Sequence, residues 1–375
     1  MNTSCRGLIA SLALLFMATL ASAQAEESLA KHFEYDPILT EPMQQDEVEP
    51  APAQIMGQDS LTAEFCEKCC FDGGCGSDCC GSTCCDSDCC GCCNSCGCCD
   101  THGCVLPELL LGCFCPTPCC FDDWISPMTN PVFFEDPRTL TELRGIFIQH
   151  KVPQTALGGD IQLYALQIRA ALSDRLSLIA TKDGYAVSTN PLIADGWADL
   201  SLGLKYNLYR DCCTESLLTG GVVYKIPVGS HRTQQGLGDG LFHVFLSGGT
   251  ELCCDWHYLS SLGFRLPVDD NAETTSMYWS NHLDYYLGHG FYALGECNWY
   301  HWLESGTNGV PGISGGDLFN LGSTGVAGNN IVSGAFGVKY KPNRLMELGV
   351  AWEVPLTERR DVLENRLTVD LILRY

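Results

Sequence analysis

The sequence predicts an all-β protein: an antiparallel up-and-down transmembrane β-barrel of about 12 strands, preceded by a disordered acidic leader and a cysteine-rich module. Three observations support this prediction. From Thr139 onward, apolar and polar side chains alternate in segments of strand length, the links between segments are alternately long and short, and the chain ends on an apolar stripe that includes Tyr375. Alternation at a period of two means that the two faces of each strand meet different environments.

The last segment shows the alternation most clearly. One face is apolar throughout, whereas the other carries Thr368, Asp370 and Arg374 beside Ile372. Such a strand suits a wall with lipid outside and a wet lumen inside. The apolar face comprises Leu367, Val369, Leu371, Leu373 and Tyr375. Ending on an aromatic residue in this register resembles the C-terminal insertion signal of bacterial outer-membrane proteins, so outer-membrane lipid and the barrel-insertion machinery are the expected partners.

Twelve segments fit the strand pattern, an even number, as single-chain bacterial barrels require. Long and short links alternate strictly, beginning with the long link 151–159 and the short link 172–174, which places both ends of the predicted barrel, residues 139–375, on the periplasmic side. The predicted strands span residues 139–150, 160–170, 175–186, 197–209, 214–228, 240–251, 255–266, 276–287, 290–302, 330–340, 345–356 and 366–375.

Residues 1–23 have the features of a secretory signal peptide. Arg6 supplies a positive charge, residues 8–20 are apolar, and Ala21-Ser22-Ala23 fits the small-residue cleavage rule. The apolar run is shorter than the roughly 20 residues that a membrane-spanning helix needs. Together with the barrel, this segment predicts an outer-membrane location with the N-terminal cysteine-rich segment in the periplasm.

Residues 24–64 form an acidic segment that contains Pro42, Pro50 and Pro52 and has no sustained period. It offers too little apolar surface to fold alone, so we expect a disordered linker. The whole chain carries 21 Lys plus Arg against 45 Asp plus Glu, a formal net charge of -24. This excess of negative charge leaves no electrostatic basis for nucleic-acid binding, and no nucleic-acid partner is expected.

Residues 65–120 form a cysteine-rich module with almost no apolar core, which disulfides or a bound metal must order. Export to an oxidising compartment favours disulfides, within the chain or as cross-links to itself or to envelope proteins. CxxC spacings also suit zinc or copper(I), so a metal at this module stays open, and no other cofactor is expected. The candidates include Cys66, Cys69, Cys79, Cys80, Cys84, Cys85, Cys89 and Cys90.

Two further cysteine pairs lie far downstream, Cys212-Cys213 and Cys253-Cys254. Both fall in predicted periplasmic turns, on the side where the cysteine-rich module is expected. The hypothesis is that these pairs tie the module to the rim of the barrel or to neighbouring molecules, as disulfide or metal partners.

The segment before the barrel carries a short motif: Asp123-Trp124-Ile125-Ser126-Pro127, Asn130-Pro131, Phe134-Glu135-Asp136-Pro137-Arg138 and Thr141-Glu142. It resembles the start of porin-like outer-membrane proteins of planctomycete-type bacteria. These are similar to the broad group of transporters named for the meta-pathway of phenol degradation. The resemblance covers residues 121–375 and implies a porin-like barrel with a transport role, whereas the cysteine-rich module departs from that broad group.

The predicted inward faces carry charges of both signs, which either polarise an open channel or pair into a network that fills it. A 12-strand barrel is intermediate between filled 8-strand barrels and open 16-strand porins. We expect residues 121–138 to form either a linker or a plug at the periplasmic mouth. The predicted lumen lining is Glu142, Arg144, Asp199, Lys205, Lys225, His257, Arg265, His282, Asp284, Glu347, Glu353, Asp370 and Arg374.

The sequence contains no GxSxG elbow, HExxH, P-loop or EF-hand, so no enzyme is expected. His257, His282 and Asp284 share the predicted interior, and we favour ordinary lumen polarity there over an acid–base or metal site. The leading hypothesis is therefore an outer-membrane pore or transporter-like barrel for passive movement of small solutes. The alternative is a structural envelope protein that uses the barrel as an anchor and the cysteines for cross-linking or metal binding.

Overall fold

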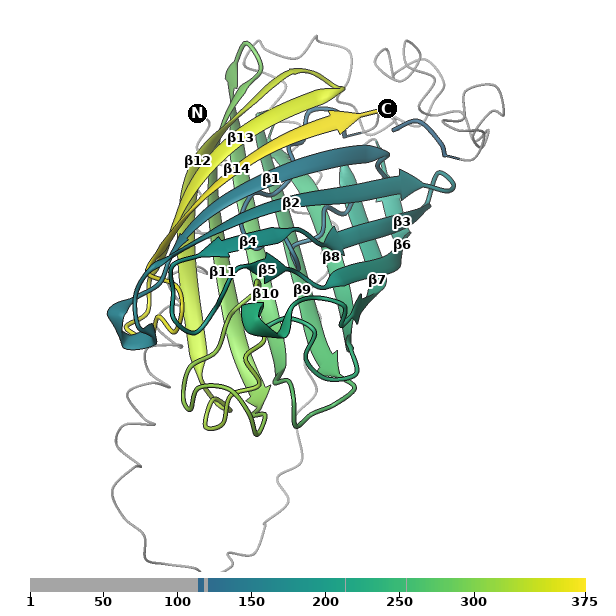
Figure 1. Ribbon diagram of the computed structural model, residues 1–375. Helices are drawn as coiled ribbons and strands as arrows, with labels where there is room; N and C mark the ends of the chain where they lie inside the picture. Colours follow the sequence, from purple (N-terminus) through teal and green to yellow (C-terminus); the bar gives the residue numbers. More distant parts are fainter. Residues whose placement is uncertain (1–113, 118–120, 213, 254) are drawn as a thin grey trace, which may run out of the picture. The chain divides into compact units, whose positions relative to one another are not determined.

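The computed structural model describes residues 114–117, 121–212, 214–253 and 255–375. The predicted signal peptide, the acidic linker and the cysteine candidates from Cys66 to Cys90, together with Cys213 and Cys254, lie outside these residues. Within them the chain forms one antiparallel sheet that closes on itself (Figure 1). No helix in this part of the chain is long and apolar enough to cross a membrane.

The described residues form fourteen strands and two short 3-10 turns. Their bounds are β1 (Glu142–Lys151), η3 (Gln154–Ala156), β2 (Asp160–Ala171), β3 (Leu176–Lys182), β4 (Tyr185–Ser188), β5 (Gly196–Trp197), β6 (Leu200–Asp211), β7 (Ser216–Ile226), η4 (His231–Thr233), β8 (Leu241–Cys253), β9 (Trp256–Pro267), β10 (Thr275–Gly288), β11 (Phe291–Glu304), β12 (Asn330–Asn343), β13 (Met346–Pro355) and β14 (Asn365–Arg374).

The barrel closes because β1 pairs with β14 on one side and with β2 on the other. Strands β3 and β4 both pair with β2, and β5 and β6 continue the next strand of the wall, so 14 labelled strands form 12 wall strands. The predicted 12-strand antiparallel barrel is confirmed. Gly184 marks one interruption: its φ is +113°, and a Cβ there would lie 2.4 Å from the carbonyl oxygen of Tyr164.

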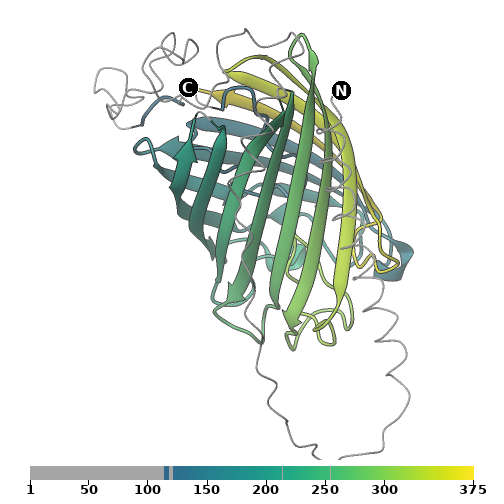
Figure 2. The same ribbon diagram turned by 180° about the vertical axis from the view of Figure 1, so that it is seen from behind.

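The two ends of the barrel differ in their connections, as Figures 1 and 2 show. The short-turn end carries the links 172–175, 212–215, 254–255, 289–290 and 344–345, and the long-loop end carries the links 152–159, 189–195, 227–240, 268–274, 305–329 and 356–364. In the β10–β11 turn, His289 and Gly290 both have positive φ, the conformation that tight hairpins require. Tyr375 lies at the short-turn end, where Thr117 N donates to its carbonyl oxygen at 2.6 Å.

The outer face of the wall is apolar and exposed, whereas the inner face is polar and buried. Along β14 and the following Tyr375, Leu371, Leu373 and Tyr375 are exposed, whereas Asp370, Ile372 and Arg374 alternate with them and are buried. Other exposed side chains of this outer face include Tyr164, Leu166, Ile168, Leu200, Leu202, Leu204, Tyr206, Val222, Phe242, Val244, Leu246, Leu262, Phe264, Phe336, Val338, Leu348, Val350 and Trp352. An uninterrupted apolar belt of this kind is typical of a barrel surrounded by lipid.

Candidate functional site

The interior of the barrel is occupied by the chain itself. Residues 121–138, here called the internal segment, precede β1, and every residue from Trp124 to Arg138 is buried. This segment forms hydrogen bonds with inward side chains of ten wall strands: β1, β2, β6, β7, β8, β10, β11, β12, β13 and β14. It is therefore held from nearly all sides of the wall.

Small residues on the inner face make room for the internal segment. A Cβ on Gly249 of β8 would lie 2.6 Å from the ring of Trp124, and one on Gly349 of β13 would lie 2.5 Å from Sδ of Met128. Neither glycine has a positive φ, so close approach and not backbone conformation requires a missing side chain here. At Gly349 the wall side chain of Asp370 is also close, 2.6 Å from the position of a Cβ.

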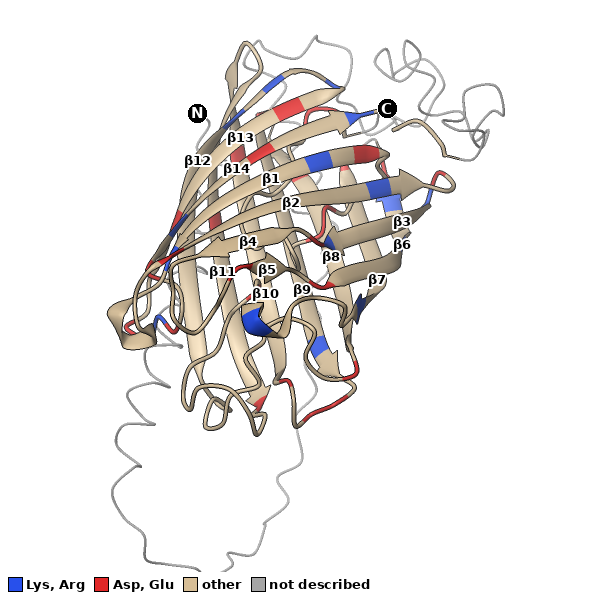
Figure 3. Cartoon of the chain, in the orientation of Figure 1, with Lys and Arg blue, Asp and Glu red and all other residues tan. Residues whose placement is uncertain are grey.

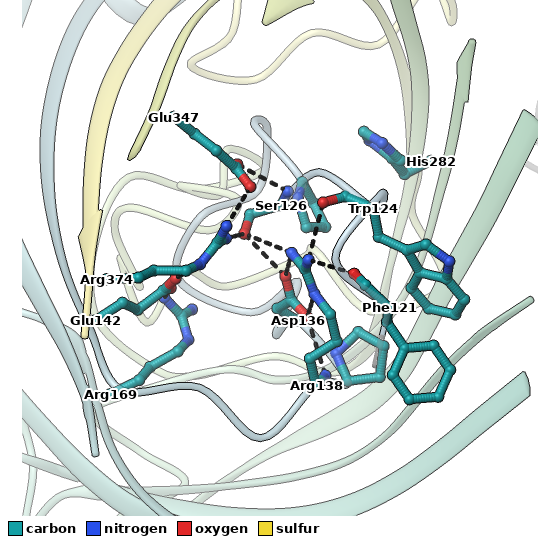
Figure 4. Close-up of polar contacts among 12 residues, drawn as sticks. Phe121, Trp124, Ser126, Asp136, Arg138, Glu142, Arg169, His282, Glu347 and Arg374 are labelled. Carbon is teal, nitrogen blue, oxygen red and sulfur yellow. Dashed lines mark hydrogen bonds and ion pairs between the residues drawn. The ribbon is translucent and has the colours of Figure 1, made fainter. Parts of the chain in front are cut away.

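An ion-pair network near the short-turn end holds the start of the segment (Figure 4). Arg138 pairs with Asp136 (Nη2 to Oδ2, 2.7 Å) and donates to the carbonyl oxygen of Trp124 at 2.8 Å. Ser126 Oγ donates to Asp136 at 2.9 Å and accepts from Arg374 at 2.9 Å. Ion pairs and hydrogen bonds within the internal segment thus fix its fold, and Arg374 of the last strand holds it to the wall.

The wall side of this network is continuous. Arg374 pairs with Glu142 at 2.9 Å and Glu347 at 2.5 Å, and Arg169 bridges Glu142 at 2.8 Å and Glu135 at 2.6 Å. Figure 3 shows charged positions gathered near the short-turn end of β13, β14, β1 and β2. Burial of charges is costly unless they are paired, so each member depends on its partners.

A second layer of this network joins β12 to β13, β14 and β1. Lys339 Nζ lies 3.0 Å from Glu347 and 3.2 Å from Asp370, and Arg144 pairs with Asp370 at 2.8 Å. Lys339 and Arg144 also donate to the carbonyl oxygens of Ser126 and Pro127. The backbone of the internal segment therefore supplies acceptors that complete the coordination of wall cations.

A chain of histidines and carboxylates crosses β9, β10 and β11. His257 Nδ1 lies 2.8 Å from Asp284, His282 Nε2 lies 3.1 Å from the other oxygen of Asp284, and His282 Nδ1 lies 2.6 Å from Glu296. Glu296 in turn accepts from Met128 N at 2.7 Å and Thr129 N at 2.6 Å. Both ring nitrogens of His282 therefore face carboxylates, and the chain ends on the internal segment.

The long-loop end is closed differently, by apolar packing. Val132 and Phe133 at the tip of the internal segment join a buried cluster with Tyr278, Trp302, Leu318, Phe319, Leu321, Val326, Ile146, Ile148 and Val362. At its edge Arg366 pairs with Glu353 at 2.6 Å and Asp317 at 2.8 Å. The interior thus changes from ionic at one end to largely apolar at the other.

The structure buries every residue of the predicted lumen lining, and none of them is isolated. Five belong to the ion-pair network and three to the histidine chain. Of the others, Lys205 pairs with Glu135, Lys225 with Asp199, Glu353 with Arg366, and Arg265 lies 4.5 Å above the ring of Phe133. Cys212 and Cys253 lie at the short-turn end, as does Cys115, whose amide donates to Ala171 O.

Sequence reasoning missed several interior charges. Arg169, Glu296, Lys339 and Arg366 all lie on inward faces that the same alternation marks, so the pattern contained the signal for them. Glu135, Asp136 and Arg138 belong to the internal segment, which has no period, and only the short FEDPR motif pointed to them.

The carboxyl of Glu215 at the short-turn end has a shifted pKa. Glu215, in the link between β6 and β7, accepts from Trp124 Nε1 at 2.9 Å. Burial raises the pKa of Glu215 to about 7, and the nearby Glu251 carboxylate acts in the same direction.

Within the described residues, no group of three or more His, Cys, Asp or Glu is arranged to hold a metal ion.

No model of a known protein family matches the sequence, and no curated protein sequence matches it. Solved structures resemble it in shape. An outer-membrane channel from Pseudomonas putida F1 is 14% identical with a TM-score of 0.47, covering 67% of this chain and 100% of that one. The NanC porin is 7% identical with a TM-score of 0.40, covering 63% and 98%.

The KdgM porin is similar to the same degree, 9% identical with a TM-score of 0.39, covering 62% of this chain and 99% of its own. All three are channels or porins by name. At these identities and TM-scores the likeness carries no argument about function, and the barrel fold rests on the strand pairing of this chain.

Proposed function

We propose that this protein is an outer-membrane pore or transporter-like barrel for small solutes, closed at rest by its internal segment, and that it performs no catalysis. The internal segment carries this proposal. The side chains of this 12-strand wall do not fill its interior by themselves, and the internal segment occupies the remaining space. If the segment leaves the lumen, a passage remains. An 8-strand barrel has no such passage, because the side chains of its own wall fill its interior.

The kind of contact supports a movable closure at the short-turn end. There the segment is held mostly by hydrogen bonds and ion pairs, such as Arg374 to Ser126 and Lys339 to the Ser126 carbonyl. Water can replace such contacts when the segment leaves, whereas a dry apolar core has no such substitute. The exposed apolar outer face supports the outer-membrane location, and the expected partners remain lipid and the barrel-insertion machinery.

The experiment is planar-bilayer conductance of the full-length protein. We expect rare, small openings for the wild type and a several-fold higher open probability for Gly249→Val and Gly349→Val, whose side chains collide with Trp124 and Met128. Gly145→Val is the matched control, because its Cβ would meet nothing closer than 3.9 Å.

Folding of each variant is checked by gel migration with and without boiling, since a folded barrel resists detergent and runs faster unboiled. Variants that keep this shift yet remain as closed as the wild type would refute the pore.

A second function is favoured by one observation: Cys115, Cys212 and Cys253 all lie at the short-turn end. We propose that this end, on the periplasmic side, is a cross-linking platform through the cysteine-rich module, as in an envelope protein anchored by its barrel. Mass mapping of the oxidised protein tests this. Links between the module and Cys212, Cys213, Cys253 or Cys254 support it, and four free thiols at these positions exclude it.

A further inference from the structure

We propose that residues 305–329, here called the capping loop, form a second closure of the lumen that is coupled to the internal segment, so that each closure holds the other in place. The loop joins β11 to β12 at the long-loop end of the barrel. The coupling would regulate the proposed channel and rests on that function only for the passage of solutes, because the contacts themselves exist in the closed barrel.

The middle of the capping loop turns into the barrel. Within residues 314–323 every residue except Gly316 is buried. Leu318 and Phe319 line the same interior cavity as Val132 of the internal segment. A loop that only linked two strands would run over the surface in contact with water. This stretch therefore closes the long-loop end of the lumen from the side opposite to the entry of the internal segment.

Polar contacts around its edge hold the capping loop to two neighbouring loops. Asn320 Oδ1 accepts from Thr274 N at 2.9 Å, and Asn320 Nδ2 donates to Thr274 O at 3.0 Å. Ser314 N donates to Asp361, in the loop before β14, at 2.9 Å. None of these contacts belongs to the strand pairing of the wall, so the loop can lift while the barrel stays closed on itself.

The two closures meet inside the barrel. Val132 and Phe133 of the internal segment share one buried apolar cluster with Leu318, Phe319 and Leu321 of the capping loop. If either closure leaves this cluster, apolar surface of the other becomes exposed to water, which is unfavourable. Each closure therefore stabilises the other, and the effect must be reciprocal.

Arg265 of β9 connects the two closures a second time. Its guanidinium lies 4.5 Å above the ring of Phe133, and its Nη1 donates to Gly316 O at 2.7 Å. Gly316 has a φ of +64°, and nothing lies within 4 Å of a Cβ there. The backbone conformation that aims this carbonyl, and not a lack of space, therefore favours glycine. One side chain of the wall thus contacts the internal segment and the capping loop together.

The test is hydrogen–deuterium exchange of the full-length protein in detergent at a fixed pH, followed by mass spectrometry. Leu318→Ser combined with Phe319→Ser keeps the length of the capping loop but removes its apolar contacts. We expect faster exchange within residues 314–323, because the loop lifts. The amides of Met128 and Thr129 pair with Glu296 on β11, away from the substitutions, and should nevertheless exchange faster by about fivefold or more.

Val310→Ser, at a half-buried position of the same loop outside the cluster, is the matched control and should change neither rate. A second variant replaces residues 310–322 by Gly-Ser-Gly-Ser, which the base of the loop can accommodate because Asn308 and Ser323 already pair. It should accelerate exchange at Met128 and Thr129 in the same way. The boiling-dependent gel shift verifies that the barrel of each variant is folded.

Unchanged exchange at Met128 and Thr129 in both loop variants would overturn the coupling. Unchanged exchange within residues 314–323 in the double-serine variant would overturn the closure. Arg265→Met should accelerate exchange in both regions, and acceleration in only one of them would contradict its role as a connection. Conductance is recorded separately, so faster exchange in a barrel that never conducts would support the coupling and refute only the pore.

Discussion

Thr129 of the internal segment donates its backbone N–H to Oε2 of Glu296 on β11 at 2.6 Å, and its hydroxyl donates to the same oxygen. The other oxygen of Glu296 receives Met128 N and faces His282 Nδ1 at 2.6 Å. The buried carboxylate of Glu296 therefore connects β11 of the wall with both His282 and the internal segment. Loss of this carboxylate should affect the position of both partners.

Replacing Glu296 by Gln should loosen the internal segment. The variant loses the charge that orients two amides and leaves His282 facing a neutral amide, so we expect a loss of about 3 kcal/mol in the free energy of unfolding. Urea titration followed by tryptophan fluorescence measures this, and conductance should rise in parallel. Glu304→Gln, at the exposed end of β11, is the control and should change neither quantity. Equal stability of the two variants would contradict the assigned role.

Arg374→Gln should be more damaging than its position at the chain end suggests. It leaves Glu142 and Glu347 buried without their shared cation, at a cost of about 3–5 kcal/mol. Adding Glu347→Gln should recover part of that loss, which a double-mutant cycle on urea midpoints detects. The matched control is Arg360→Gln, whose partner Glu364 is on the surface, with an expected effect of about 0–1 kcal/mol. Strict additivity of the two substitutions would argue against the network.

Stability should fall with rising pH because of Glu215. Its pKa is about 7 in the folded protein against an ordinary value of 4.5, so the folded state holds the proton more tightly. This contribution is complete below pH 4.5 and is lost as the pH rises through 7. Between pH 5 and 8 the wild type should lose on the order of 2 kcal/mol more than Glu215→Gln, which stays neutral. Parallel pH profiles for the two proteins, measured by urea titration, would exclude this role.

A charge on the outer face should oppose membrane insertion. Leu371→Lys places an ammonium group in the middle of the exposed apolar face of β14, at a cost of about 2–4 kcal/mol if that face meets lipid. Leu157→Lys, at the C-cap of η3, is a still more exposed control outside the strands and should have no effect. Folding into lipid vesicles, followed by the boiling-dependent gel shift, measures both. Equal folding yields would mean that this face does not contact lipid.

The wall of the barrel was predictable because each strand has one face toward an apolar environment and one toward a polar environment. Apolar and polar residues therefore alternate along each strand in the sequence. Pairing was not predictable in the same way. Glu142 and Arg374 both alternate inward, but only closure of β1 on β14 makes them neighbours. The route of the internal segment depends on contacts such as Thr129 with Glu296, for which no local pattern exists.

Arg374 lies one residue from the chain terminus, yet it contacts Ser126 near the start of the described chain. Pairing of β14 with β1 brings Arg374 beside Glu142, and the same guanidinium holds Ser126 of the internal segment. Sealing of the ring and seating of the segment therefore share one side chain, and a chain cut short before β14 would forfeit both together.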